Sequence, residues 1–258
     1  MVETYLTKIL DDHRRAELDD TRDVSELVRQ ASAQPPTRGF RSALAGPGVS
    51  VIAEVKRRSP SKGELAPGLD PGALARAYET GGAACLSVLT DEDHFGGSRL
   101  DLQAARAATS LPVLRKDFTV SVRDICDARL MGADAVLLIV TALTAAELMH
   151  FHSVALDLGL DVLVEVHDDR ELSVALALGA SMIGVNQRDL ATFQVDPERA
   201  VRLAASIPDG VVKVTESGIT GPHDIAALAE AGYHAVLVGE HLVTAPDPAA
   251  AVRALRRD

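Results

Sequence analysis

The chain has 258 residues, 47% of them apolar, and carries a formal net charge of −11 with an isoelectric point near 5.2. This size and composition indicate a globular protein of one large domain or two small ones. Binding to nucleic acid or to an anionic membrane surface requires many local Lys and Arg side chains, so the acidic balance argues against both kinds of partner.

The cysteines and the lack of long apolar runs suggest a compartment. Cys85 and Cys126 lie in apolar or helical patterns without CxxC spacing, so we expect reduced core thiols. The N-terminal segment lacks the apolar stretch of a signal peptide, and no later run is long enough to span a bilayer. These features predict a cytoplasmic protein.

Residues 1–48 predict a helical extension that precedes the main fold. Apolar side chains recur at helical spacing, as at Leu6, Ile9 and Leu27, before the break QPPTRG at residues 34–39. We expect helices that pack on the rest of the protein, over one of its ends.

After this extension, short β-branched runs alternate with helical stretches. The eight runs predict strands at residues 49–55, 85–89, 111–117, 135–140, 161–166, 182–186, 211–216 and 235–240. The stretches between and after them predict helices at residues 70–82, 98–109, 122–132, 144–159, 169–179, 196–207, 222–232 and 246–257. Several helical stretches end in Gly directly before the next run, which is typical of a helix that turns straight into a strand.

This alternation predicts an α/β fold with a parallel sheet, because the runs are apolar on both faces. Eight units in about 250 residues is the size of a (β/α)8 TIM barrel. A doubly wound open sheet is the main alternative, but no G-x-G-x-x-G follows the first run. We therefore expect a single domain over residues 1–258, with the N-terminal helical extension at 1–48 and eight βα units at 49–258.

Polar side chains gather where the predicted strands end, which is where a barrel of this kind builds its active site. Side chains two apart on a strand share a face, so Glu54 and Lys56 both point into the barrel mouth. The candidates at the strand ends are Glu54, Lys56, Lys116, Asp117, Glu165, His167, Asn186, Arg188, Glu216 and Ser217.

Any single charged residue at a strand end is more often a solvated end than a catalyst. Several such groups in one apolar mouth are costly unless they pair with each other or with a ligand. We expect Arg57, Arg58, Arg115 and Asp189 to face solvent or to form loop salt bridges. The histidines lack partners at metal-ligand spacing, so no metal site is predicted.

The last two strands are each followed by a glycine turn, ESGI and VGEHL. Backbone N–H groups at such turns can hold a phosphate, and barrels often bind phosphate at these two strands. The pattern predicts a phosphorylated small-molecule substrate bound by Ser217, Gly218, Gly239 and Glu240. In addition, Ser59, Ser61 and Lys62 could close over the same phosphate.

Several of these segments together resemble one enzyme family, indole-3-glycerol phosphate synthase. The resemblance covers the chain from about residue 49 onward and, more loosely, the N-terminal helices. It is carried, in this order, by VIAEVKRRSPSKGEL, YETGGAACLSVLTDEDHFGGS, PVLRKDF, ARLMGADAVLLIV, LVEVH, IGVNQRDLATFQVD, VTESGI and AVLVGEHLV.

The resemblance implies a lyase of tryptophan biosynthesis that works without a cofactor or metal. Such an enzyme converts 1-(2-carboxyphenylamino)-1-deoxyribulose 5-phosphate to indole-3-glycerol phosphate, with release of carbon dioxide and water. Primary tryptophan synthesis and a paralogous supply of indole compounds are both open, as is the oligomeric state, a monomer included.

The same resemblance implies roles for the candidate residues. Lys116 would be the general acid at the substrate carbonyl, and Lys56, paired with Glu54, would hold the anthranilate carboxylate or also act as an acid. Glu165 would accept a proton or stabilise charge. Asn186 and Glu216 would orient the sugar hydroxyls and the anilino group, Arg188 and Ser59 would serve the polar ends of the substrate, and Phe118 would contribute to an apolar wall with Phe95, Leu114 and Leu137.

Converging lysines and carboxylates should also perturb one another's pKa values, and we expect this to let a lysine donate a proton near neutral pH.

Two other functions stay open at this point. One is a Schiff-base lyase with Lys116 or Lys213 as nucleophile, although Lys213 has the strand parity that points outward. The other is a barrel without catalytic activity that binds a phosphorylated metabolite or a partner enzyme.

Overall fold

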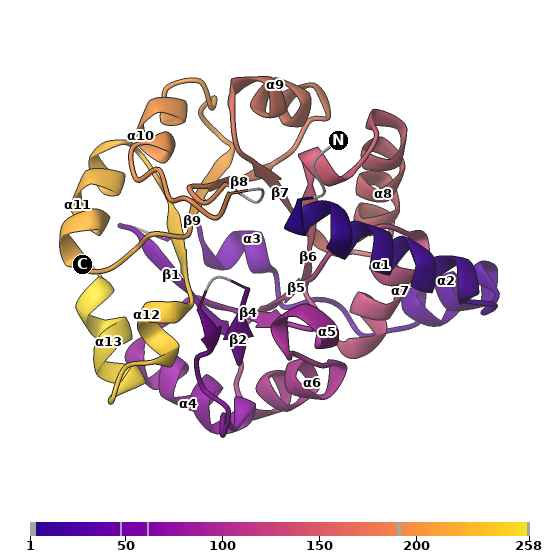
Figure 1. The fold of residues 1–258 in the computed structure, drawn as a ribbon, viewed down its shortest axis with the longest axis horizontal. Coiled ribbons are helices and arrows are strands. Elements are labelled where there is room, and N and C mark those ends of the chain that lie inside the picture. Colours follow the sequence, from indigo (N-terminus) through magenta and orange to yellow (C-terminus); the bar gives the residue numbers. More distant parts are fainter. Residues whose placement is uncertain (1–3, 47, 61, 190–191, 257–258) are drawn as a thin grey trace.

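The computed structural model describes residues 4–46, 48–60, 62–189 and 192–256 (Figure 1). Eight parallel strands form a closed barrel, in the order β1-β10-β9-β8-β7-β6-β5-β4 around the ring. They are β1 Ser50–Val55, β4 Cys85–Leu89, β5 Val113–Lys116, β6 Ala135–Ile139, β7 Asp161–Val166, β8 Met182–Asn186, β9 Val212–Glu216 and β10 Ala235–Val238. The predicted (β/α)8 barrel is confirmed, and the open sheet is excluded because β1 pairs with both β4 and β10.

The strand predictions agree closely with the structure. Three runs, 85–89, 161–166 and 182–186, match their strands to the residue, and the others differ by one or two residues at an end. These runs were readable because every strand is almost wholly buried between the barrel interior and the helices, so β-branched residues fill both faces.

Helices surround the barrel, one or more after each strand (Figure 1). The long ones are α4 Pro71–Gly81, α6 Arg99–Ala108, α7 Val122–Met131, α8 Ala145–Asp157, α9 Asp169–Ala177, α10 Arg199–Ala204, α11 Pro222–Glu230 and α13 Pro248–Leu255. Their starts follow local chemistry: Asp70 caps α4 with Pro71 in the first turn, and Thr144 and Glu147 form a capping box on α8. The predicted helix at 196–207 is shorter in the structure, Arg199–Ala204.

The core has two layers. One lies between the barrel and its helices, and the other fills the barrel interior with Ile52, Leu114, Leu163 and their neighbours. Helix α3, Phe40–Ala43, closes the end of the barrel where the strands begin, because the fully buried ring of Phe40 packs into this interior layer. The interior is thus a packed core rather than a pore, and the opposite end carries the cavity that can hold a ligand.

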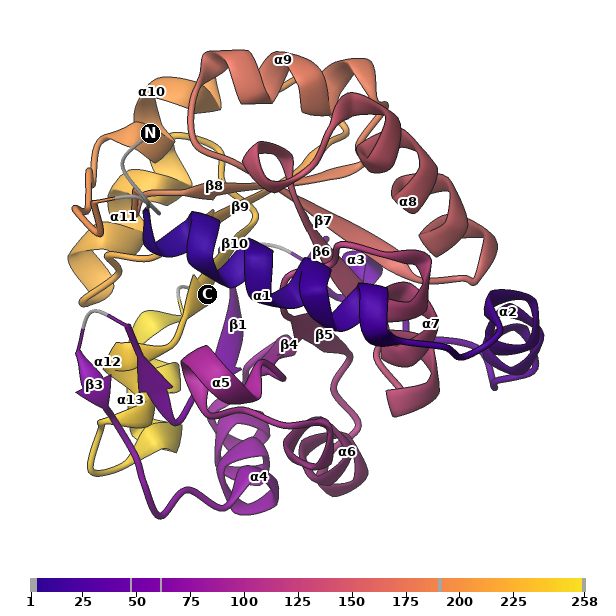
Figure 2. The same ribbon diagram turned by 45° about the vertical axis from the view of Figure 1, so that its right-hand side comes forward.

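The N-terminal extension forms α1, Tyr5–Asp19, and α2, Val24–Ser32. Helix α1 lies across the barrel end at which the strands finish, and α2 lies beside α7 (Figure 2). The buried apolar side chains of these helices are Ile9 on α1 with Leu27 and Ala31 on α2, which fit the helical spacing, whereas Leu6 is only half-buried. The prediction of a helical extension over one mouth is confirmed.

Several short elements were not expected from the sequence. They are the hairpin of β2 Arg58–Ser59 and β3 Gly63–Glu64, the helices α3, α5 Glu92–Phe95 and α12 Glu240–Val243, and the 3-10 turn η1 Val140–Ala142. Within the described residues, no helix has the length and apolar character needed to cross a membrane. The division of the chain into a single domain stays a prediction.

Candidate active site

A cavity of about 560 Å³ opens at the end of the barrel where the strands finish. Its walls include side chains from β1, β5, β7, β8 and β9 and from helix α1. All six residues predicted to be catalytic line it, namely Glu54, Lys56, Lys116, Glu165, Asn186 and Glu216. The seven predicted binding residues, Ser59, Phe118, Arg188, Ser217, Gly218, Gly239 and Glu240, line it as well.

Lys116 is at the centre of the charged groups. Its Nζ lies 3.3 Å from Oε2 of Glu165 and 3.4 Å from Oε2 of Glu216. Both carboxylates are almost fully buried. One ammonium therefore serves two carboxylates that are withdrawn from solvent.

Glu165 and Glu216 differ in their other contacts and in the direction of their pKa shifts. Oε1 of Glu165 also accepts a hydrogen bond from Nδ2 of Asn186 at 3.1 Å, and Nε2 of His167 lies 3.4 Å from the same oxygen. Among the described residues, Oε1 of Glu216 has no hydrogen-bond partner. Burial alone would raise both pKa values, but Lys116 and His167 hold the pKa of Glu165 well below its usual range.

Glu216 shifts in the opposite direction. Burial, with the nearby charges of Glu165 and Glu54, raises the pKa of Glu216 to about 8, because the attraction of Lys116 is too weak to offset them. At neutral pH the site thus holds one ionised and one protonated carboxyl group around a single cation.

These carboxylates also act on Lys116 itself. Burial disfavours its ammonium form, but Glu165, Glu216 and Glu54 outweigh burial and raise the pKa of Lys116. The expectation that the cluster lets a lysine donate a proton near neutral pH is therefore wrong for Lys116, whose pKa is raised rather than lowered. The physical reason is that this lysine is surrounded by negative charge rather than by other cations.

Glu54 and Lys56 form a second pair on β1 and just after it. The Nζ of Lys56 lies 2.6 Å from Oε1 of Glu54, and the hydroxyl of Ser87 donates to Oε2 of Glu54 at 3.4 Å. Alternation along the strand places both side chains on the mouth, as predicted. The pair leaves the Lys56 ammonium at the cavity wall, where it can meet an anionic group of a ligand.

Two glycines make room for the buried carboxylates. A β-carbon at Gly184 on β8 would overlap Oε1 of Glu216, and a β-carbon at Gly239 would overlap Oε1 of Glu54 and come within 3.0 Å of Nζ of Lys56. Each carboxylate thus occupies the volume that a neighbouring side chain would otherwise fill.

The loops after β9 and β10 form one side of the cavity. Ser217 and Gly218 both have positive φ angles, 68° and 73°, and the carbonyl of Ser217 accepts a hydrogen bond from Nε2 of Gln187 at 2.8 Å. Gly239 and Glu240 begin the short helix α12 on the same side. Backbone N–H groups in turns of this kind can bind an anion.

The β2–β3 hairpin lies beside the turn that follows β10. Ser59 lines the cavity, and its Oγ is buried with no hydrogen-bond partner among the described residues. Lys62 reaches Oε1 of Glu240 at 3.6 Å. Ser61, predicted to act with them, lies outside the described residues.

On the β8 side, Arg188 is held by its own loop. Its guanidinium donates to the carbonyl of Phe193 at 3.0 Å, and its backbone N–H donates to Oδ1 of Asn186 at 3.0 Å. Phe193 also has a positive φ of 60°, and its ring meets the edge of Tyr5 from α1 at 5.3 Å. The loop after β8 and helix α1 therefore meet over the mouth.

The apolar wall is partly as expected. Phe95, Phe118 and Leu137 line the cavity, whereas Leu114 is wrong for this role because it is fully buried in the barrel interior. Sequence reasoning missed other contributors, namely Tyr5, Asp91, Phe193, Val195, Thr220 and Thr244. The single aromatic ring in the loop after β8 was the signal available for Phe193.

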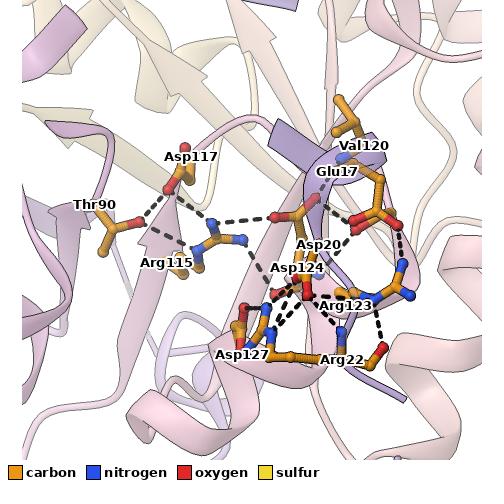
Figure 3. Close-up of polar contacts among 11 residues, drawn as sticks. Glu17, Asp20, Arg22, Thr90, Arg115, Asp117, Val120, Arg123, Asp124 and Asp127 are labelled. Carbon is orange, nitrogen blue, oxygen red and sulfur yellow. Dashed lines mark hydrogen bonds and ion pairs between the residues drawn. The ribbon is translucent and has the colours of Figure 1, made fainter. Parts of the chain in front are cut away.

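A buried ionic network supports the strand end that carries the central lysine (Figure 3). Arg115 donates to Oδ2 of Asp117 at 2.8 Å and to Oγ1 of Thr90 at 3.2 Å, and it lies 3.6 Å from Oδ1 of Asp124. Thr90 also donates to Asp117. The expectation that Arg115 faces solvent is wrong, but the alternative of a salt bridge is confirmed.

The network continues to the N-terminal extension (Figure 3). Arg22 donates to Asp127 of α7 at 2.8 Å, while Arg123 of α7 pairs with Glu17 and donates to the backbone carbonyl of Arg22 at 3.0 Å. Closer to the mouth, His13 of α1 lies 3.0 Å from Asp91. Helix α1 is thus anchored across the cavity by the contact of His13 with Asp91 and by the ion pair of Glu17 with Arg123.

One group of three described residues has potential metal ligands near one another. Ligand atoms of His13, Asp91 and Asp117 lie within 4.8 Å. Each is already engaged by protein groups, because Asp117 is bonded to Arg115 and Asp91 accepts the backbone N–H of His94 at 2.6 Å. We assign no metal to this group.

Comparison with known proteins gives a consistent answer. The family model for indole-3-glycerol phosphate synthase matches residues 6–255. The chain is 52% identical over 229 residues to indole-3-glycerol phosphate synthase of Streptomyces griseus, covering 89% of this chain and 85% of that protein. The enzyme of the same name from Mycobacterium avium is also 52% identical, with 89% and 84% covered.

Solved structures show the same fold at much lower identity. Thiamine phosphate pyrophosphorylase from Pyrococcus furiosus superimposes with a TM-score of 0.61 at 17% identity, covering 80% of this chain and 93% of that one. This likeness supports the barrel architecture alone. The family match rests on curated relatives that are 52% identical to this chain over 229 residues. The chain belongs to the indole-3-glycerol phosphate synthase family.

Proposed function

We propose that this protein converts 1-(2-carboxyphenylamino)-1-deoxyribulose 5-phosphate to indole-3-glycerol phosphate, carbon dioxide and water. The observation that carries the proposal is the cluster of Lys116, Glu165 and Glu216 beside the Glu54–Lys56 pair in one cavity. Ring closure, decarboxylation and dehydration need a positioned cation, a proton donor and a proton acceptor, and this cluster offers all three.

In the first step, the aryl carbon that bears the carboxylate forms a bond to the ketone carbon, and the ketone oxygen becomes negative. Lys116 would donate a hydrogen bond and then its proton to this oxygen as general acid. Because its pKa is raised, Lys116 is fully charged when the substrate arrives. Glu216, protonated at neutral pH, lies within reach to return a proton to the lysine.

Lys56 would hold the carboxylate of the substrate until it leaves as carbon dioxide, whose departure returns the electron pair to the ring. Its contact with Glu54 fixes the ammonium at the wall while leaving it two further N–H donors. Lys56 would then also give a proton to the departing hydroxyl, which leaves as water.

In the last step, the hydroxyl leaves as water and a proton is lost from the carbon attached to nitrogen. Glu165 is the proposed acceptor, since its lowered pKa keeps it ionised and Asn186 orients it. Asn186 and Glu216 would also orient the sugar hydroxyls and the anilino group.

The phosphate end would bind at the turns of Ser217, Gly218, Gly239 and Glu240, with Ser59 from the β2–β3 hairpin. The aromatic end would lie against Phe118 and its apolar neighbours, and Arg188 would serve a polar end of the substrate. The cavity therefore offers separate polar and apolar regions for one amphipathic, phosphorylated molecule.

The direct test is to incubate the purified protein with the carboxyphenylamino deoxyribulose phosphate and to follow indole fluorescence. We expect turnover, and its complete absence would refute the assignment. A Schiff-base lyase would instead be trapped by borohydride with a keto substrate. The geometry disfavours that chemistry, since Lys116 is held as an ammonium and Nζ of Lys213 is bound to the carbonyl of Ala204 at 2.9 Å.

We also propose a cytoplasmic location. Cys85 and Cys126 are buried and unbonded to each other. Burial raises the pKa of the Cys126 thiol to about 11, so it is held in its unreactive protonated form. Such thiols are typical of a reducing compartment.

A further inference from the structure

His167 lies directly behind Glu165, outside the set of described residues that line the cavity. It follows Glu165 by two positions at the end of β7, so alternation turns both side chains to the same face. Its Nε2 lies 3.4 Å from Oε1 of Glu165, and its Nδ1 lies 2.9 Å from Oε2 of Glu171. The imidazole ring thus bridges two carboxylates.

The outer carboxylate is rigidly held. Glu171 is in the first turn of α9, and its backbone N–H donates to the capping Oδ1 of Asp168 at 2.8 Å. Its Oε2 accepts the backbone N–H of His167 at 2.9 Å as well as facing the ring. The orientation of the ring is therefore set from the helix side and not by the cavity.

This arrangement favours a charged ring. A neutral imidazole donates from one nitrogen only, so one lone pair would face a carboxylate at close range. The Nε2 atom is buried and makes no hydrogen bond among the described residues, so its 3.4 Å contact with Oε1 of Glu165 is electrostatic. Burial alone would lower the pKa of His167, but Glu165 and Glu171 together raise it to about 10.

The ring faces two carboxylates, and the Lys116 ammonium lies beyond Glu165, 3.3 Å from its Oε2. Strand β7 supplies Glu165 and helix α9 supplies Glu171. Strand β6 and η1, which pack on β7, contribute Val140, Thr141 and otherwise apolar residues, with no titratable side chain. From β8, the neutral amide of Asn186 donates to Oε1 of Glu165, the same oxygen that His167 faces.

We propose that His167 is a positioning residue for the reaction, whose imidazolium keeps Glu165 ionised and aimed at Lys116. This inference rests on the proposed function. It explains why two similar buried carboxylates around one ammonium differ: Glu165 has a second cation behind it and Glu216 does not. His167 in this way decides which of the two carboxylates is the base and which one carries the proton.

The kinetic test compares His167→Gln with the wild type over a range of pH. Gln keeps a neutral N–H near Glu165 but removes the charge. Without the second cation beside it, the pKa of Glu165 should rise although Lys116 remains, so the acidic limb of the kcat profile should move up by about 1 to 3 pH units. KM should change by less than about threefold, since Glu165 acts in the later steps. An unchanged profile would overturn the inference.

The matched control is His150→Gln on α8, which removes an exposed histidine and should leave the profile as it is. Glu171→Gln is a second variant that leaves His167 in place. It removes one of the two carboxylates that face His167, so the pKa of His167 should fall by about 1 unit or more.

A measurement without turnover uses protein labelled with 15N in histidine. We expect both ring nitrogens of His167 to be protonated at neutral pH in the wild type, with titration shifted downward in Glu171→Gln. A neutral His167 ring at pH 7 would overturn the inference even if the enzyme turns over normally. If the wild type shows no turnover, the proposed function falls and this role with it, so the two failures are distinguishable.

Discussion

The ammonium of Lys116 lies 3.3 Å from Oε2 of Glu165, and this contact spans the mouth of the barrel from β5 to β7. Both side chains are nearly withdrawn from solvent, where an ion pair is strong but costly to break. The pair therefore places a charged proton donor and an ionised acceptor side by side before any substrate has bound.

Replacing Lys116 with alanine should abolish most of the activity. We expect kcat to fall by at least about 100-fold, the usual effect of losing a general acid, with a smaller change in KM. Lys213→Ala is the matched control, because Lys213 bonds to a backbone carbonyl away from the cavity. Indole fluorescence in steady state measures both variants. Equal turnover of Lys116→Ala and wild type would refute the mechanism.

Glu216→Gln should change how stability depends on pH. The folded pKa is raised to about 8 from the ordinary 4.5, so the native carboxyl retains a proton that the unfolded one releases. The stability of the wild type therefore falls as pH rises through this window, by up to about 1.4 kcal/mol per pH unit. The stability of the glutamine variant, relative to that of the wild type, should therefore increase from about pH 5 to about pH 8. Urea unfolding at several pH values tests this, and a constant difference would contradict it.

Arg115→Ala should destabilise the protein strongly. The guanidinium is buried against Asp117 and Asp124, and its removal leaves a buried carboxylate without its cation. We expect a loss of about 3 to 5 kcal/mol in the free energy of unfolding. Arg15→Ala, which breaks an exposed pair with Asp12, should cost less than about 0.5 kcal/mol. Similar losses in the two variants would contradict the role of the network.

His13→Gln should loosen helix α1 in a pH-dependent way. Burial alone would lower the pKa of His13, but Asp91 and Asp117 raise it above 6.5. The stabilisation is thus complete below the unfolded pKa and is lost as pH rises through the folded one. We expect the variant to be less stable by about 1 to 3 kcal/mol near pH 6, with the gap narrowing at higher pH.

Thermal or urea unfolding of both proteins at matched pH values measures this gap. The control is His150→Gln, since His150 is exposed on α8. A gap that widened with rising pH would show that His13 acts as a neutral group.

The architecture was predictable because two periodic signals agreed. The runs at 161–166 and 182–186 are apolar on both faces, and the intervening helix has its own caps and closing glycine. Residues such as Glu54 and Lys116 were found because strand ends in a parallel barrel converge whatever the loops do.

The remainder depends on contacts that periodicity does not encode. Arg115 alternates outward from the mouth, and only the position of Asp124 on the next helix turns it into a buried ion pair. Similarly, Tyr5 and Phe193 are 188 residues apart in sequence, and nothing local indicates that their rings meet. The direction of the Lys116 pKa also required knowing that three carboxylates surround it.

Gly184 and Gly239 have a consequence for how this barrel can change during evolution. The oxygens of Glu216 and Glu54 occupy the volume that a methyl group at these glycines would take. Positions 184 and 216, and positions 239 and 54, should therefore vary only as pairs. A descendant that shortened either carboxylate could accept a larger neighbour, and a side chain at position 184 or 239 would then be a mark that the original chemistry had been lost.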